Sequence, residues 1–128
     1  MQHYLGCAIG FNSNIISKDD WKALSQIDNI DEHIHLNPSS ENFSFTIIPY
    51  TEDAFDMSTC SYWSSIVLKD IASISMVKAI SFAEIKKIND IYFPLSSKHK
   101  SEILQVLSQF GLEKYIEQVE VITYSYCC

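Results

Sequence analysis

A histidine pair is the first feature of this chain that could do chemistry. His33 and His35 are separated by one residue, which would place both imidazoles on the same side of an extended segment. Acidic side chains lie close to them in sequence, at Asp31, Glu32 and Glu41. A zinc site needs three or four ligands in a fixed geometry, and an HxH pair alone does not define one. Two interpretations stay open: a metal-dependent site, or two solvated loop histidines.

Nucleophilic side chains are present without a recognisable catalytic pattern. Cys60 and the pair Ser64 and Ser65 lie near Tyr62 and Trp63 in the sequence. No GxSxG, SxxK or HExxH motif occurs along the chain. A small hydrolase or metal-dependent protein centred on the histidine pair is an alternative, because catalytic triads are defined by geometry and not by spacing. We expect a protein that is not an enzyme and that needs no cofactor and no metal.

Charge is the strongest pattern in the sequence. The 128 residues hold nine lysines and no arginine, against 16 Asp and Glu, which gives a formal net charge of −7. Phosphate recognition needs a basic face and favours the arginine guanidinium, so nucleic acid is not the expected ligand. Residues 1–60 carry nine acids and two lysines, whereas residues 61–128 carry seven of each. The whole negative excess therefore lies in the first half of the chain.

Two acidic segments, residues 28–42 and 51–60, flank a predicted strand over residues 43–50. The first is polar and favours a loop, with room for a short extended piece over residues 33–36. If the two segments meet in space, they form a negative surface that selects a basic partner, with aromatic anchors beside it. A solubilising acidic face without a partner is the simpler alternative. The expected partner-binding residues are Asp28, Asp31, Glu32, Glu41, Tyr50, Glu52, Asp53, Phe55, Asp56, Tyr62 and Trp63.

Strands are predicted at both ends of the chain, over residues 3–11 and 119–126, from their β-branched and aromatic content. The strand over residues 43–50 contains Pro49, which lacks an N–H, so it should be an edge strand or end there. Residues 61–80 are ambiguous. Their apolar residues fit a helical stripe, while their serines and β-branched residues favour a strand, most clearly over residues 76–80.

Helices are predicted from their capping signals. Ser17 precedes an amphipathic stretch with two aspartates in its first turn. A capping box at residues 81–84 opens a second helix, which must stop before Pro94. A third helix covers residues 97–110 and ends at Gly111, with a further turn or two after it.

Strands and helices do not alternate strictly in this order. We therefore predict an α+β fold in one domain, residues 1–128, with a mainly antiparallel sheet and three to four helices packed on it. The first 17 residues lack the basic start and cleavage pattern of a signal peptide. Elsewhere the longest run without Asp, Glu or Lys, residues 57–68, is too short to span a bilayer. We expect a cytoplasmic protein that does not bind membranes.

A small acidic chain of this kind resembles the immunity proteins of bacterial polymorphic toxin systems, such as contact-dependent growth inhibition and the colicins. The resemblance is one of type and covers the whole chain, through its size, its acidity and its lack of catalytic motifs. It implies a stoichiometric inhibitor that binds a cognate toxin domain, often a basic nuclease, and blocks its active site. A phage-type anti-defence or adaptor protein would share the acidic surface and is a further alternative.

Overall fold

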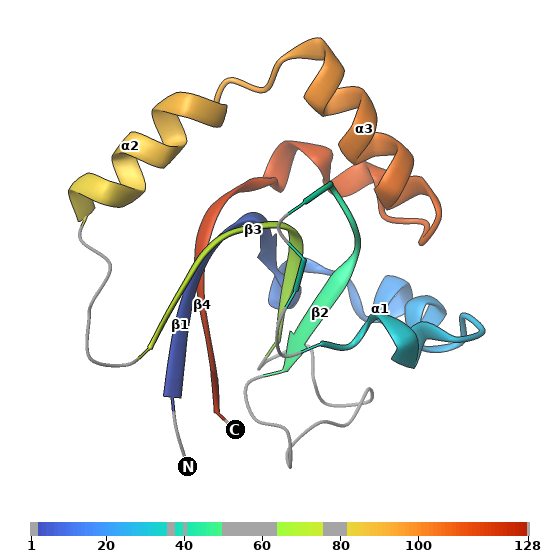
Figure 1. The fold of residues 1–128 in the computed structure, drawn as a ribbon. Helices are drawn as coiled ribbons and strands as arrows, with labels where there is room; N and C mark the ends of the chain where they lie inside the picture. The colour runs from blue at the N-terminus through green and yellow to red at the C-terminus, as the bar shows by residue number, and fades with distance from the viewer. Residues whose placement is uncertain (1–2, 36–37, 40, 50–63, 76–81, 128) are drawn as a thin grey trace.

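One four-stranded antiparallel sheet, in the order β2-β3-β1-β4, forms the centre of the fold (Figure 1). The structure is a computed structural model that describes residues 3–35, 38–39, 41–49, 64–75 and 82–127. The strands are β1 (His3–Asn12), β2 (Thr46–Pro49), β3 (Ser64–Ser75) and β4 (Glu120–Cys127). The predicted α+β fold with an antiparallel sheet is confirmed.

Three α-helices and three short 3-10 helices lie within the described ranges. The α-helices are α1 (Lys18–Ser25), α2 (Phe82–Tyr92) and α3 (Ser97–Ser108), and the 3-10 helices are η1 (Ser13–Ile15), η2 (Ile30–His33) and η4 (Glu113–Gln118). The predicted cap of α1 is present, because the Ser17 side chain accepts a hydrogen bond from the Asp20 N–H. Gly111 follows α3 with φ at +70°, the left-handed conformation expected of a residue that ends a helix.

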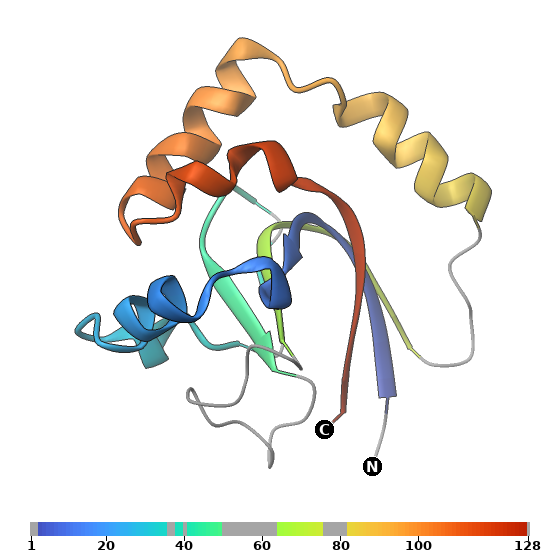
Figure 2. The same ribbon diagram turned by 180° about the vertical axis from the view of Figure 1, so that it is seen from behind.

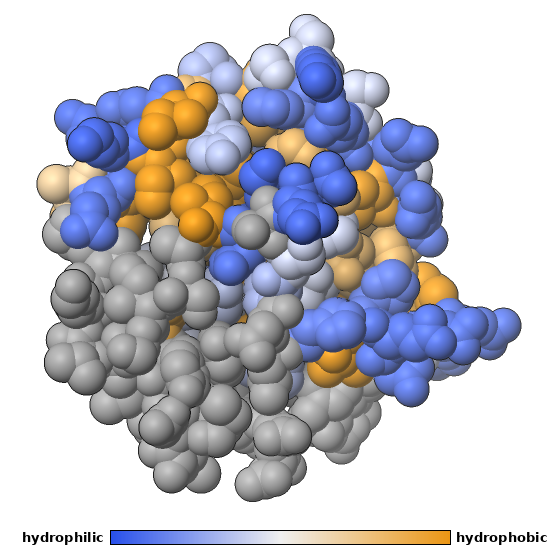
Figure 3. Space-filling model, viewed as in Figure 1, coloured by the Kyte–Doolittle hydropathy of each residue, from blue (hydrophilic) through white to orange (hydrophobic). Residues whose placement is uncertain are grey.

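The main core lies between one face of the sheet and a layer formed by α1, α3 and η4 (Figures 1 and 2). Trp21 and Leu24 of α1 and Ile103 and Leu107 of α3 are its buried helical side chains. Helix α2 lies against β4 and buries none of its residues. Its Phe82 is 85% exposed, and Figure 3 shows apolar residues gathered over this helix.

Strand β3 shows why the composition of residues 61–80 was ambiguous. Its register against β1 skips Leu68 and Ile71, so each is an extra residue at a β-bulge. Leu68 is buried in the main core and Ile71 packs against that core. Two bulges break the alternation of a regular strand and leave apolar residues at spacings that imitate a helix. The helical interpretation is therefore wrong for residues 64–75, and residues 76–80 lie outside the described part.

Strand β2 is shorter than the prediction for residues 43–50. Phe43 lies outside the ladder: its ring packs edge-on against His99 of α3 at 5.5 Å, and the Lys69 ammonium lies 5.4 Å from its centroid. The described ladder covers Thr46–Pro49, and β2 lies at the edge of the sheet, which is one of the two outcomes predicted from the missing N–H of Pro49.

The opposite face of the sheet carries a buried acid. The Tyr124 hydroxyl donates a hydrogen bond to Asp70 Oδ1 at 2.6 Å. Asp70 is only 9% exposed, and this burial raises the pKa of its carboxyl although the hydrogen bond from Tyr124 lowers it. The Tyr124 ring lies over Gly6, where a Cβ atom would come within 2.1 Å of the ring. Glycine is therefore required at this position.

Candidate functional site

Four exposed acids form the described part of the predicted acidic surface: Asp28, Asp31 and Glu32 lie just before or within η2, and Glu41 follows it in the chain. We call Asp28, Asp31, Glu32 and Glu41 the η2 surface. None of the four forms an ion pair with another described residue. Figure 3 shows hydrophilic residues gathered over the lobe of residues 18–35, which projects from the body of the molecule in Figure 1. Four exposed carboxylates with no ion-pair partner among the described residues can face another molecule.

A tight turn and a buried anchor hold the acids of η2. Asn29 adopts the left-handed conformation with φ at +62°, which asparagine tolerates better than most residues. Its carbonyl accepts the Glu32 N–H at 3.0 Å, and the Asp31 carbonyl accepts the Ile34 N–H at 3.2 Å. Ile30 lies in the main core, only 7% exposed. The turn thus fixes one side chain inward and leaves its acidic neighbours outward.

A hollow of about 390 Å³ lies beside η2 and β2. Glu32 is on its wall, and Ser39, another lining residue, accepts the Glu41 N–H at 3.3 Å. Two acids of the η2 surface therefore lie at or next to the same hollow. The full lining is Glu32, His33, His35, Pro38, Ser39, Ser44, Phe45 and Thr46.

Both histidines line this hollow, but they differ in burial: His33 is half-buried, whereas His35 is exposed. His33 ends η2, and its ring packs edge-on against Phe110 at 4.9 Å and against Phe45 at 6.2 Å. Its Nδ1 lies 3.2 Å from the Phe45 carbonyl oxygen. His35 is exposed, and its backbone N–H bonds to the Ile47 carbonyl at 3.1 Å, which fits the predicted short extended piece. His33 is therefore a packing residue.

No group of three or more His, Cys, Asp or Glu side chains within the described ranges is arranged to hold a metal ion. Cys7, which is buried, is a free cysteine, and burial raises the pKa of its thiol. Cys60 lies outside the described residues, as do seven of the predicted partner-binding residues. These seven are Tyr50, Glu52, Asp53, Phe55, Asp56, Tyr62 and Trp63.

One acid of the same lobe is fully engaged within the molecule. Asp20 Oδ2 accepts hydrogen bonds from the Tyr115 hydroxyl at 2.6 Å and the Ser17 hydroxyl at 2.9 Å, and lies 2.6 Å from Lys114 Nζ. These contacts, with Lys114 the strongest, lower the pKa of Asp20 to about 2. Asp20 therefore ties α1 to η4 and is not part of the η2 surface.

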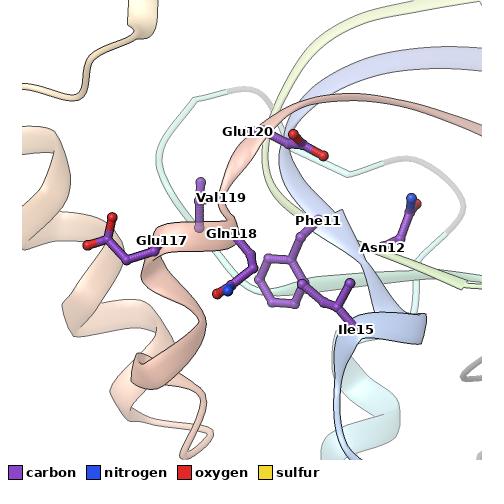
Figure 4. A pocket seen from close by; sticks show the side chains of 7 residues that line it. All are labelled: Phe11, Asn12, Ile15, Glu117, Gln118, Val119 and Glu120. Atoms are coloured by element: carbon purple, nitrogen blue, oxygen red, sulfur yellow. The ribbon is translucent and has the colours of Figure 1, made fainter.

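Sequence reasoning did not find a second hollow, which is shown in Figure 4. It lies where the end of β1 and η1 meet η4 and the start of β4, so its walls come from the two ends of the chain. Phe11 is on its floor and Ile15 at its edge. No local sequence pattern marks this hollow, because the 40% exposure of Ile15 follows from the fold.

Comparison with known proteins gives no relative: the chain matches no protein-family model, no curated protein and no solved structure. Within the described ranges, no helix has both the length and the apolar character needed to cross a bilayer. The function must therefore be argued from the surfaces described above.

Proposed function

We propose that this protein is a stoichiometric inhibitor, an immunity protein that binds a basic toxin domain of the nuclease class in the cytoplasm. The observation that carries the proposal is the η2 surface, whose four exposed carboxylates have no ion-pair partner among the described residues. A cluster of like charges on a surface repels itself unless a partner of opposite charge compensates it. A basic nuclease supplies that charge, because its active site is built to hold phosphates.

The shape of the η2 surface supports the same proposal. Three of its acids, Asp28, Asp31 and Glu32, project on a lobe whose base is held by the buried Ile30 and by the network around Asp20. A rigid support lowers the entropy lost on binding, which favours tight association. The hollow beside Glu32 offers the buried ring of Phe45 as an apolar contact. Charge would therefore steer the encounter, and the hollow would add specificity.

The test is co-expression with the protein encoded immediately upstream. We expect its carboxy-terminal domain to be toxic when expressed alone, and to be captured at a one-to-one ratio and made harmless by this chain. An upstream protein that is neither captured nor neutralised would contradict the proposal.

Charge reversal then locates the binding surface. The variant Asp28→Lys/Asp31→Lys/Glu32→Lys should lose protection. The matched control Asp90→Lys/Glu102→Lys/Glu113→Lys changes the net charge equally at acids outside the η2 surface and should keep it. A further variant that reverses Glu52, Asp53 and Asp56 tests the second predicted acidic segment in the same assay.

A further inference from the structure

The hollow of Figure 4 combines an apolar floor with an acidic rim. Its volume is about 250 Å³. Phe11 and Val119 on the floor are 1% and 6% exposed, while Ile15 at the edge is 40% exposed. The Phe11 ring is also held from behind by the Tyr115 ring, with the two centroids 6.0 Å apart. The floor is therefore a fixed apolar surface, and Ile15 at its edge is the apolar residue most accessible to a ligand.

Polar groups border this floor on two sides. In Figure 4, Asn12 lies on one side of the Phe11 ring and Gln118 on the other, with Glu120 above the ring and Glu117 beyond Gln118, its carboxylate pointing away from the ring. No lysine or histidine is among the lining residues. Glu120 forms no ion pair with any other described residue. The rim thus offers two carboxylates and two amide oxygens, all of which accept hydrogen bonds.

We infer that this hollow binds the side chain of a lysine or arginine supplied by another protein. The methylenes of such a side chain would lie along Ile15 at the edge of this floor, as long cationic side chains commonly do on apolar surface. Its charged end would reach Glu120 or Glu117 and gain charge-assisted hydrogen bonds. The inference is independent of the proposed function, because the hollow shares no lining residue with the η2 surface.

A cation of the molecule itself already approaches this rim. Lys100 Nζ lies 3.5 Å from Glu117 Oε1, and the side chains of Lys100 and Glu117 are 49% and 77% exposed. A contact that long and that exposed is weak. An incoming cation therefore competes with Lys100 for Glu117 and meets no competitor among the described residues at Glu120.

The test uses amino-acid amides as probes in an NMR titration of the whole chain. We expect N-acetyl-lysine amide and N-acetyl-arginine amide to cause saturable shifts at the backbone amides of residues 12, 15 and 117–120. N-acetyl-norleucine amide, which has the stem of lysine without its ammonium, should bind more weakly. Equal shifts with the norleucine amide, or no saturable shift with either cationic amide, would overturn the inference.

Isosteric variants test the rim. Glu120→Gln and Glu117→Gln should each weaken binding of the lysine amide by about two- to fivefold, as expected for exposed ion pairs. Glu113→Gln, an exposed acid of η4 outside the lining, is the control and should change nothing. Lys100→Gln should tighten binding, since it frees Glu117, whereas Lys98→Gln should not. Equal effects of the rim variants and their controls would contradict a specific site.

Discussion

Asp20 holds α1 to η4 through a single carboxylate oxygen. Its position in the first turn after Ser17 already predicted a favourable interaction with the helix end. Its two stronger partners, Lys114 and Tyr115, lie 94 and 95 residues further along the chain. No local sequence pattern predicts the contact of Asp20 with these residues, because it depends on η4 packing beside α1. The cap could be predicted from sequence, and the ion pair could not.

Replacement of Asp20 by asparagine should make stability less dependent on pH. The folded-state pKa of Asp20 is about 2, below its ordinary value of 3.8. A carboxyl with a lowered pKa stabilises the folded state above pH 3.8, and this contribution is lost as the pH falls toward 2. Urea unfolding at several pH values should show Asp20→Asn less stable than wild type at pH 7, with the difference shrinking in acid. The neighbouring Asp19→Asn is the control, and an equal pH effect there would contradict this role.

The hydrogen bond between Tyr124 and the buried Asp70 gives a second prediction for single residues. Tyr124→Phe removes the hydroxyl that donates to a nearly buried carboxyl, and should cost about 1–3 kcal/mol of unfolding free energy. Asp70→Asn keeps an acceptor and removes the buried charge, so it should cost less. Because burial raises the pKa of Asp70, its ionisation opposes folding as the pH rises above 3.8, and Asp70→Asn removes that trend. If Asp70→Asn lowered the unfolding free energy at pH 7 more than Tyr124→Phe does, this account of the buried carboxyl would be contradicted.

At the scale of elements, α3 and β3 show what local sequence determines. The bounds of α3 were nearly predicted because the apolar spacing and Gly111 both act within a few residues. The two bulges of β3 are set by its register against β1, which lies more than 50 residues away. Likewise, Phe43 leaves the ladder of β2 to pack on His99. Elements defined by partners distant in sequence were the ones predicted poorly.

The cap of α3 can be tested by one substitution. The Ser96 side chain accepts a hydrogen bond from the His99 N–H at 3.1 Å. Ser96→Ala should therefore lower the unfolding free energy by about 1 kcal/mol, as for other helix caps. Ser97→Ala, one residue inside the helix and exposed, should change it little. Equal losses in chemical denaturation of the two variants would show that capping is not the cause.

At the scale of the whole molecule, part of the negative excess of residues 1–60 lies on one exposed surface, the η2 surface. Asp28, Asp31 and Glu32 lie just before or within η2, and two of the four described acids, Glu32 and Glu41, lie at or next to one hollow. The contribution of residues 50–63 stays a prediction, since they lie outside the described part. The acidic loop over residues 28–42 was therefore the part of the candidate site that could be predicted, because charged residues are read directly from the sequence. The hollow of Figure 4 was not, because its walls come from opposite ends of the chain.

The central claim is that the η2 surface steers a basic partner. The most direct measurement is the association rate constant with the toxic upstream domain, as a function of salt. For Asp28→Lys/Asp31→Lys/Glu32→Lys, we expect this rate constant to fall by roughly tenfold or more at low salt, because complementary charge accelerates encounter. The difference from wild type should shrink toward 1 M salt, where screening is nearly complete. An association rate unchanged by this reversal, or lowered equally by Asp90→Lys/Glu102→Lys/Glu113→Lys, would contradict the claim.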